Sequence, residues 1–177
     1  MPRFTRPALS AAAALLFTAA APAALADIKI GLMVPLTGFA AADGKSAHEG
    51  AKLAVAQANA KGGINGEKVE LVVYDDQASP KEAVPAATKL IQRDKVVGGV
   101  SGSYSASTRA SAGVFQNAKV PYVTAYAIHP DITRVGDYMF RVSAMGEVQG
   151  RAGAKLVNEL GKKKVALITV KNDFGQS

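Results

Sequence analysis

The sequence predicts an α/β protein built on a mostly parallel sheet. Short, β-rich apolar runs alternate with helical patterns from residue 28 onward, and the composition (49% hydrophobic, 17 Gly, no low-complexity tract) is that of an ordered globular protein. This alternation implies helices on both faces of the sheet, joined by right-handed crossovers. In such sheets ligands bind at the carboxyl ends of the strands, near a switch in strand order.

The first 26 residues have the features of a signal peptide. Arg3 and Arg6 precede an apolar stretch over residues 8–21, and Ala24-Leu25-Ala26 is a small-x-small cleavage signature. The alternative is an uncleaved membrane anchor, but the stretch is short and alanine-rich compared with the roughly 20 apolar residues of a membrane span. We expect cleavage after Ala26 and a mature, periplasmic chain that begins at Asp27.

The composition argues against several classes of function. The chain has no cysteine and two histidines, which disfavours disulfide frameworks, zinc–thiolate sites and histidine-rich metal sites. Because residues 1–26 hold two arginines and no acidic residue, removing them lowers the formal charge from +7 to +5. The remaining basic residues are scattered, whereas nucleic-acid binders cluster them on one face. We therefore expect no cofactor and no nucleic-acid partner.

The first half of the mature chain predicts two strands and two helices. A strand over 28–35 is followed by a loop over 36–45, and a helix runs from residue 46 to the glycines at 62–63. A second strand covers 68–74. Ser79, Pro80 and Glu82 then form a capping-box signature that opens a second helix.

The second half continues the alternation. Strands are expected at 96–100, 120–124, 138–142 and 165–170, with helices from about 105 to 117 and from 147 to 160. The loops that follow the strands (36–45, 75–79, 101–105, 125–133 and 171–176) are the candidates for ligand contact.

The serine-rich loop after the third strand is a candidate anion site. Ser103 and Ser105 supply hydroxyls where a helix begins, and Gly102 permits a close approach to the backbone. Free N–H groups and the helix dipole at such a point favour a carboxylate. Alternatively, one of the serines is only a helix cap, which serines often are.

Nothing in the sequence predicts catalysis. Neither serine lies in a G-x-S-x-G elbow, and the possible bases His48 and His129 lie at a helix start and in a loop. Asp75-Asp76 lacks the further acidic partners of a metal site, so we expect the pair to end its strand and support the loop.

Four segments resemble the branched-chain amino acid (Leu/Ile/Val) substrate-binding proteins of ABC transporters. They are DIKIGLMVPLTG at residue 27, NAKGGINGEKVELVVYDDQASPKEAV at 59, KVPYVTAYAIHPDIT at 119 and YMFRVSAMGEVQG at 138. The resemblance implies a type I periplasmic binding fold, in which two α/β lobes joined by three crossover strands close on a solute. It divides the chain into a signal peptide (1–26), a nearly complete first lobe (27–143), and a crossover with the start of a second lobe (144–177). Relative to that family, we expect the chain to be truncated at its C-terminus.

The resemblance also implies a set of ligand contacts. Ser105 matches the serine that takes the ligand carboxylate, and Ser103 and Tyr104 lie in the same loop. Phe174 matches an aromatic residue that the second lobe presses onto the ligand. The remaining expected contacts are Asp43 near the ligand and, around the α-amino group, Tyr126, Ala127 and Ile128.

Two positions depart from the leucine-binding pattern. Ile128 stands where leucine-type members have a threonine, which removes a hydroxyl partner for an ammonium group. Those members also place an aromatic residue near the position of Asp43, and Asp43 could restore a charged partner for the ammonium. The ligand could therefore be another amino acid, an amide or a carboxylate without an amine.

The expected function is that of a receptor that passes a small ligand to an ABC permease in the inner membrane. A sensory module of the same fold is one alternative. An extracytoplasmic hydrolase is another, disfavoured because no nucleophile–base pair is visible.

Overall fold

The computed structural model describes residues 27–177 and contains a five-stranded parallel sheet. The strands are β1 (Ile28–Val34), β2 (Val69–Asp75), β3 (Gly98–Ser101), β4 (Tyr122–Thr124) and β5 (Met139–Arg141), in the spatial order β2-β1-β3-β4-β5. All four neighbouring pairs are parallel, which confirms the predicted fold class.

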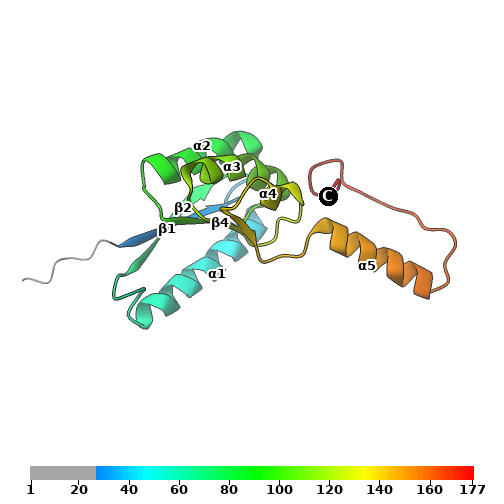
Figure 1. Cartoon of the computed structure of the whole chain (residues 1–177), viewed down its shortest axis with the longest axis horizontal. Coiled ribbons are helices and arrows are strands. Elements are labelled where there is room, and N and C mark those ends of the chain that lie inside the picture. Colours follow the sequence, from blue (N-terminus) through cyan, green and yellow to red (C-terminus); the bar gives the residue numbers. More distant parts are fainter. Residues whose placement is uncertain (1–26) are drawn as a thin grey trace, which may run out of the picture.

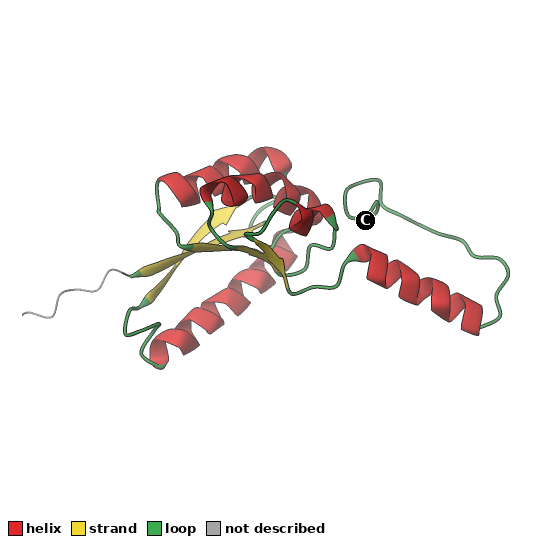
Figure 2. Ribbon diagram, viewed as in Figure 1, coloured by secondary structure: helices red, strands yellow, loops and turns green. Residues whose placement is uncertain are grey.

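Helices cover both faces of the sheet (Figures 1 and 2). Helix α1 (Ala41–Ala60) lies on one face, and α2 (Pro80–Gln92) and α3 (Ser105–Ala118) lie side by side on the other. The short α4 (Asp131–Arg134) precedes β5, and α5 (Gly146–Glu159) extends away from the sheet. The connection that follows β1 leads to β2 on one side of the sheet, and the connection that follows β3 leads to β4 on the other side. The strand order therefore switches between β1 and β3.

The core lies between the sheet and the α2–α3 face. Phe115 of α3 stacks on Tyr122 of β4 with ring centroids 4.1 Å apart, and both side chains are fully buried. Gly99 makes this possible, because a Cβ atom there would lie 2.5 Å from the Phe115 ring. The face under α1 is less closely packed: an apolar cavity of about 700 Å³ separates the helix from the strands.

Helix α1 begins earlier than the sequence predicted. The loop expected over 36–45 ends at Ala40, and residues 41–45 form the first turn of α1. Gly44 is a packing glycine and not a loop glycine, since a Cβ atom there would lie 1.9 Å from the Pro35 carbonyl oxygen. Asp43 therefore lies in the first helical turn, where an acidic side chain is favoured by the helix dipole.

The capping signature at the start of α2 is only partly realised. Ser79 is the N-cap residue and Pro80 opens the helix, as predicted, but the Ser79 side chain makes no capping hydrogen bond. The backbone N–H of Glu82 instead donates to the Ser79 carbonyl oxygen at 3.1 Å.

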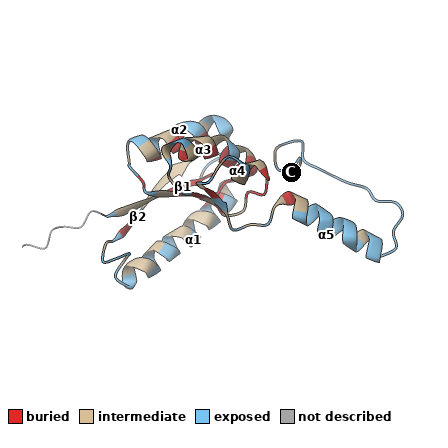
Figure 3. Cartoon of the chain, in the orientation of Figure 1, coloured by how far each residue is buried: buried red, intermediate tan, exposed pale blue. Residues whose placement is uncertain are grey.

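The prediction of a strand at 165–170 is wrong. These residues are extended but pair with no strand of the described chain, and Leu167 and Ile168 are 86% and 96% exposed. A strand requires a neighbour for its backbone hydrogen bonds, and residues 27–177 offer none at this place. The apolar pattern alone could not reveal that. Figure 3 shows the same contrast in burial between α5 and the sheet.

Candidate ligand-binding site

The loops after β1, β3 and β4 meet where the strand order switches. Phe39 lies 5.8 Å from Tyr104 between ring centroids, and Tyr104 lies 6.2 Å from Tyr126 in an edge-on arrangement. These rings border a cavity of about 470 Å³ whose wall also includes Ser105 and, from the C-terminal segment, Phe174. This is the place at which parallel α/β sheets bind ligands.

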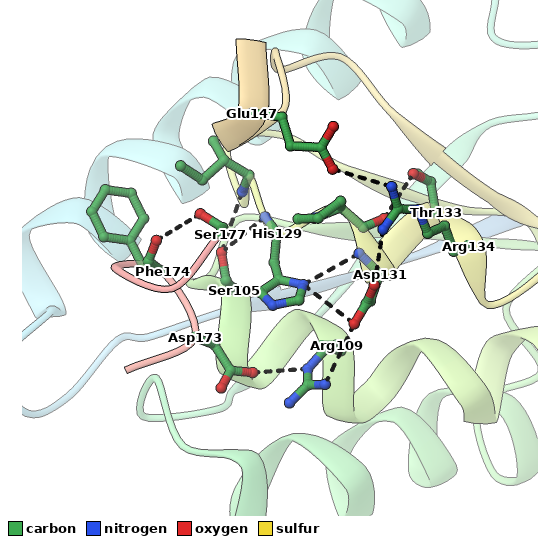
Figure 4. Close-up of polar contacts among 12 residues, drawn as sticks. Ser105, Arg109, His129, Asp131, Thr133, Arg134, Glu147, Asp173, Phe174 and Ser177 are labelled. Atoms are coloured by element: carbon green, nitrogen blue, oxygen red, sulfur yellow. Dashed lines mark hydrogen bonds and ion pairs between the residues drawn. The ribbon is translucent and has the colours of Figure 1, made fainter. Parts of the chain in front are cut away.

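Ser105 is the first residue of α3 and is almost fully buried. Its Oγ accepts the backbone N–H groups of Ile128 (3.2 Å) and His129 (3.4 Å) from the loop after β4 (Figure 4). Because a hydroxyl has two acceptor positions and one proton, both acceptor positions are used and the proton is free to donate. Ser105 is thus a hydrogen-bond donor on the cavity wall.

The start of α3 adds partial positive charge beside this hydroxyl. The N-cap residue Tyr104 has an extended backbone and its side chain makes no capping hydrogen bond to the helix. The first N–H groups of a helix have no intrahelical acceptor, and the dipole is positive there. The donor hydroxyl of Ser105 and the positive end of α3 together suit a carboxylate.

Ser103 lies elsewhere than expected. It is fully buried and does not contribute to the wall of the cavity that Ser105 lines. In the described part of the chain, its Oγ and the Oδ2 atom of buried Asp76 both lack a partner with hydrogen-bond geometry. Burial raises the pKa of Asp76 above its usual range, and the Ser103 hydroxyl opposes that rise. Ser103 therefore lies behind the site, next to Asp76.

Asp75 anchors the loop after β1. Its Oδ1 accepts the backbone N–H groups of Leu36 (2.8 Å) and Gln77 (2.9 Å), and its Oδ2 accepts the Thr37 hydroxyl. Although burial opposes the effect, these hydrogen bonds lower the pKa of Asp75. The expected role of the Asp75-Asp76 pair, to end the strand and support the loop, agrees with these contacts. No cluster of three or more metal-ligating side chains occurs within residues 27–177.

Asp43 is an exposed residue that contacts Tyr104. Its Oδ2 accepts the Tyr104 hydroxyl, and this hydrogen bond raises the pKa of Tyr104. Asp43 lines the cavity beneath α1 and not the one at Ser105. Tyr104 borders both.

The residues expected around the α-amino group make hydrogen bonds within the described structure. The Tyr126 hydroxyl donates to the Gly102 carbonyl oxygen, and burial raises the pKa of Tyr126. The Ala127 carbonyl oxygen accepts Nη1 of Arg141 (3.3 Å) and the hydroxyl of Ser143 (3.2 Å). Tyr126 and Ala127 line the cavity at Ser105, whereas Ile128 does not. The Ile128 carbonyl oxygen accepts the Gly146 N–H at 3.1 Å.

Phe174 reaches the cavity from the C-terminal segment. Asn172 Oδ1 accepts the backbone N–H groups of Phe174 and Gly175, both at 3.1 Å, which holds the turn that carries the ring. The neighbouring Asp173 accepts Nε of Arg109 from α3 at 2.8 Å (Figure 4). An ion pair thus joins the segment to the sheet region at the edge of the site.

Sequence reasoning missed three of these residues. Phe39 was overlooked, although a large aromatic residue in a loop of glycine and alanine is itself a signal. Arg109 lies within a helix and Arg141 at the end of a strand, where charged residues are common on exposed surfaces. No sequence signal marks either as a neighbour of the site.

Neither histidine is arranged as a base for Ser105. His129 Nδ1 accepts the backbone N–H of Asp131 at 3.2 Å, so the proton of the neutral ring is placed on Nε2. His48 lies on α1 and has no hydrogen bond to Ser105 in the described structure.

No helix between residues 27 and 177 combines the length and apolar character that a bilayer crossing needs.

Comparison with known proteins gives a consistent result. A model of the periplasmic binding protein family matches residues 27–177. An amino acid binding protein of Pseudomonas aeruginosa is 41% identical over 155 residues, which cover 86% of this chain and 41% of the relative. The Leu/Ile/Val-binding protein of Escherichia coli is 32% identical over 152 residues, or 85% of this chain and 41% of the relative.

Solved structures of substrate-binding proteins share the fold. The branched-chain amino acid transporter substrate-binding protein of Streptococcus pneumoniae, in complex with isoleucine, aligns with a TM-score of 0.72 and 33% identity, covering 76% of this chain and 38% of that one. A solute-binding protein of an ABC transporter from Rhodopseudomonas palustris, in complex with 3,4-dihydroxybenzoic acid, aligns with a TM-score of 0.78 and 29% identity, covering 85% and 41%.

The chain spans about two fifths of the length of these relatives, and they are substrate-binding proteins rather than enzymes. With the family match over residues 27–177 and the shared parallel sheet, the chain belongs to the periplasmic binding protein family.

Proposed function

We propose that this protein is a periplasmic, non-catalytic receptor that binds a small carboxylate-bearing ligand and delivers it to an ABC permease in the inner membrane. The ligand is an amino acid of the branched-chain type or a related carboxylate or amide. The observation that carries the proposal is Ser105, whose buried hydroxyl accepts two backbone N–H groups and, within residues 27–177, has no acceptor for its own proton. Residues 1–26 act as a signal peptide cleaved after Ala26.

The relatives support a carboxylate as the shared chemistry. One solved neighbour holds isoleucine and another holds 3,4-dihydroxybenzoic acid, two ligands that have little in common besides a carboxyl group. Ser105 and the start of α3 form a site for such a group. The rest of the ligand then contacts Tyr104, Tyr126 and Ala127 on one side and Phe174 on the other.

The proposed mechanism is closure of two regions around the ligand. Residues 27–143 form the first lobe and hold the carboxylate, and residues 144–177 begin the second lobe, which supplies Phe174. A ligand shifts such an equilibrium only by its differential affinity for the closed state, so contacts from both regions are required.

A hydrolase built on Ser105 is the weaker alternative. With Nδ1 of His129 accepting a backbone N–H, that ring offers Ser105 no free acceptor nitrogen without a change of tautomer and partner. Turnover of acyl esters that is abolished by Ser105→Ala would support this alternative. A sensory module of the same fold would differ in its partner, and genes for a kinase or regulator beside this one would favour it over transport.

The test is a thermal-shift panel on the mature gene product, from Asp27 to its natural end. It contains branched-chain, polar and aromatic amino acids, short amides and aromatic carboxylates. A ligand at about 100 times its dissociation constant stabilises the protein by about 2.7 kcal/mol. We expect at least one carboxylate to produce such a shift, and a panel with no shift at all would contradict the proposal.

Two variants locate the binding. Ser105→Ala removes a hydrogen bond to a charged group, which contributes about 1.5–3 kcal/mol, so affinity should fall roughly 10- to 150-fold. Ser107→Ala is the matched control, because Ser107 is a buried serine of the same helix whose Oγ has no partner in the described structure. If Ser105→Ala and Ser107→Ala bind the ligand with equal affinity, Ser105 is not part of the binding site.

A further inference from the structure

We propose that Asp76 is a positioning residue of the ligand site, and that the binding of a carboxylate at Ser105 is coupled to the uptake of a proton by Asp76. This inference rests on the proposed function and adds a residue that does not line the cavity itself. It follows from the place of the Asp76 side chain, which is fully buried beside two segments that supply the cavity wall. The contacts that carry it all lie within residues 27–143.

The first of these segments is the turn after β2. Asp76 Oδ1 accepts the backbone N–H of Ala78 at 3.0 Å, and the Asp76 carbonyl oxygen accepts the N–H of Ser79 at 2.8 Å. Ala78 lines the cavity at Ser105 and has a φ of 53°, while Gln77 before it has a φ of 52°. Two left-handed residues in succession are strained in a chain of L-amino acids and persist only where their surroundings fix them. The Asp76 carboxyl therefore holds Ala78 in place.

The second segment is the loop after β3, which leads into α3. Because β1 lies between β2 and β3 in the sheet, Asp76 reaches past the end of β1 to meet Ser103 of this loop. Both side chains are fully buried, and neither Asp76 Oδ2 nor Ser103 Oγ has another hydrogen-bond partner within residues 27–177. Two buried polar atoms in this position gain by pairing with each other. Ser103 lies two residues before Ser105, so the pair supports the start of α3.

The charge of Asp76 reaches the wall of the site. Burial is the main cause that raises the pKa of Tyr126, and the negative charge of Asp76 adds to the rise. Tyr126 lines the cavity at Ser105. The same charge acts on Tyr122, whose pKa is raised to about 12, mainly by burial. A ligand carboxylate at Ser105 brings a second negative charge to this region, and like charges disfavour each other's ionised form.

The sign of the coupling follows from the pKa of Asp76. Burial raises it and the charge of Asp75 adds to the rise, whereas the Ser103 hydroxyl and the Ala78 N–H oppose it. A bound carboxylate raises this pKa further, so the complex holds the proton more tightly than the free protein does. Affinity is then highest while Asp76 is protonated in the free protein. It falls as the pH rises from the pKa of the free protein to that of the complex, by at most about tenfold per pH unit for one proton.

Calorimetric titration of the mature gene product measures this coupling. The probes are carboxylates of the thermal-shift panel, beginning with isoleucine and 3,4-dihydroxybenzoate, which two solved neighbours hold. Titrations between about pH 5 and 8 keep an ordinary carboxyl group, with a pKa of about 4, ionised. Buffers with different ionisation enthalpies give the number of protons taken up. We expect uptake of up to one proton per ligand and an affinity that falls with rising pH.

The variant Asp76→Asn separates the proton from the packing. Its amide keeps an acceptor for the Ala78 N–H and gains a donor for Ser103 Oγ, but it cannot titrate. Proton uptake at this position should vanish, and the affinity should gain on the wild type by roughly 2- to 10-fold toward pH 8, since one pKa unit corresponds to a tenfold change. His129 is a second titratable group beside Ser105. Any pH dependence that it causes stays in the variant, so the difference between the two profiles belongs to Asp76.

Two further variants complete the set. Ser103→Ala removes a hydroxyl that opposes the rise in the pKa of Asp76, so the fall in affinity should move to higher pH. This variant provides the same test if Asp76→Asn does not fold. Asp137→Asn, at an exposed position, is the control and should keep the wild-type profile.

The outcomes separate this inference from the proposed function. If a carboxylate binds in a Ser105-dependent way, but the wild type and Asp76→Asn show parallel pH profiles and equal proton uptake, the coupling is overturned and the receptor function stands. If no carboxylate of the panel binds, both fail.

Discussion

The sheet region (27–143) and the C-terminal segment (144–177) contain similar apolar patterns but use them differently. In the sheet region, Leu90 and Phe115 are fully buried between helices and strands. In the C-terminal segment, Leu167 and Ile168 are almost fully exposed, and the stretch around them forms no strand. The difference teaches that an apolar, β-branched run becomes a strand only where a neighbouring strand receives it.

The largest expected effect compares one substitution in the two regions. Leu90→Ala removes a side chain with no exposed surface and should cost about 2–5 kcal/mol of unfolding free energy. In a chain of residues 27–177, Leu167→Ala, at 86% exposure, should change it by less than about 0.5 kcal/mol. Urea unfolding followed by circular dichroism measures both. Similar losses in the two variants would show that residue 167 is buried in solution.

A smaller effect concerns the buried carboxyl behind the site. Because the pKa of Asp76 is raised above 3.8 in the folded state, the folded protein holds this proton more tightly than the unfolded chain does. The resulting stability is fully present below about pH 3.8 and is lost as the pH rises through the raised value. Asp76→Asn has no such proton, so the stability of the variant should rise relative to that of the wild type as the pH rises toward neutrality.

Urea unfolding at a series of pH values checks this behaviour. The difference between Asp76→Asn and the wild type cancels the titration of carboxyl groups that do not interact with Asp76, whereas the neighbouring Asp75 does interact with it. Asp137→Asn, at an exposed position, is the control. Parallel stability curves for Asp76→Asn and the wild type would argue against the raised pKa.

The smallest expected effect concerns the ion pair that joins the two regions. Arg109 and Asp173 are partly exposed, and exposed pairs contribute about 0.2–1 kcal/mol. Arg109→Gln should therefore speed hydrogen exchange of the Phe174 and Gly175 amides by about 1.5- to 5-fold at low salt, and less at 1 M salt. Arg151→Gln, which breaks a pair within α5, should leave these amides unchanged. If both variants exchange alike, the pair does not hold the segment.

The same comparison explains what the sequence could predict. Alternating patterns were sufficient for five strands, the parallel sheet and the position of Ser105 at the start of α3, because each depends on local periodicity and capping. The early start of α1 was missed because Gly44 looks like a loop residue until its contact with Pro35 is known. The prediction of a strand at 165–170 was wrong because the apolar pattern of a segment does not show whether a neighbouring strand is present to pair with it.

The site shows the same limit. Ser105, Tyr104, Tyr126, Ala127 and Phe174 do line one cavity, whereas the structure places Ser103, Asp43 and Ile128 off its wall. The five cavity-lining residues could be selected from the sequence because they lie in, or next to, the loops that follow strands. Only three-dimensional contacts show that Asp43 is engaged by Tyr104, or that Arg141 occupies the carbonyl oxygens of the loop after β4.

The most direct test of the central claim is a crystal structure of the mature protein with the ligand that gives the largest thermal shift. We predict a ligand carboxylate oxygen about 2.5–3.2 Å from Ser105 Oγ, with the backbone N–H groups of Ile128 and His129 still bound to that hydroxyl. A carboxylate held at another place, with no contact to Ser105, would contradict the assignment of this serine as the anchor of the site.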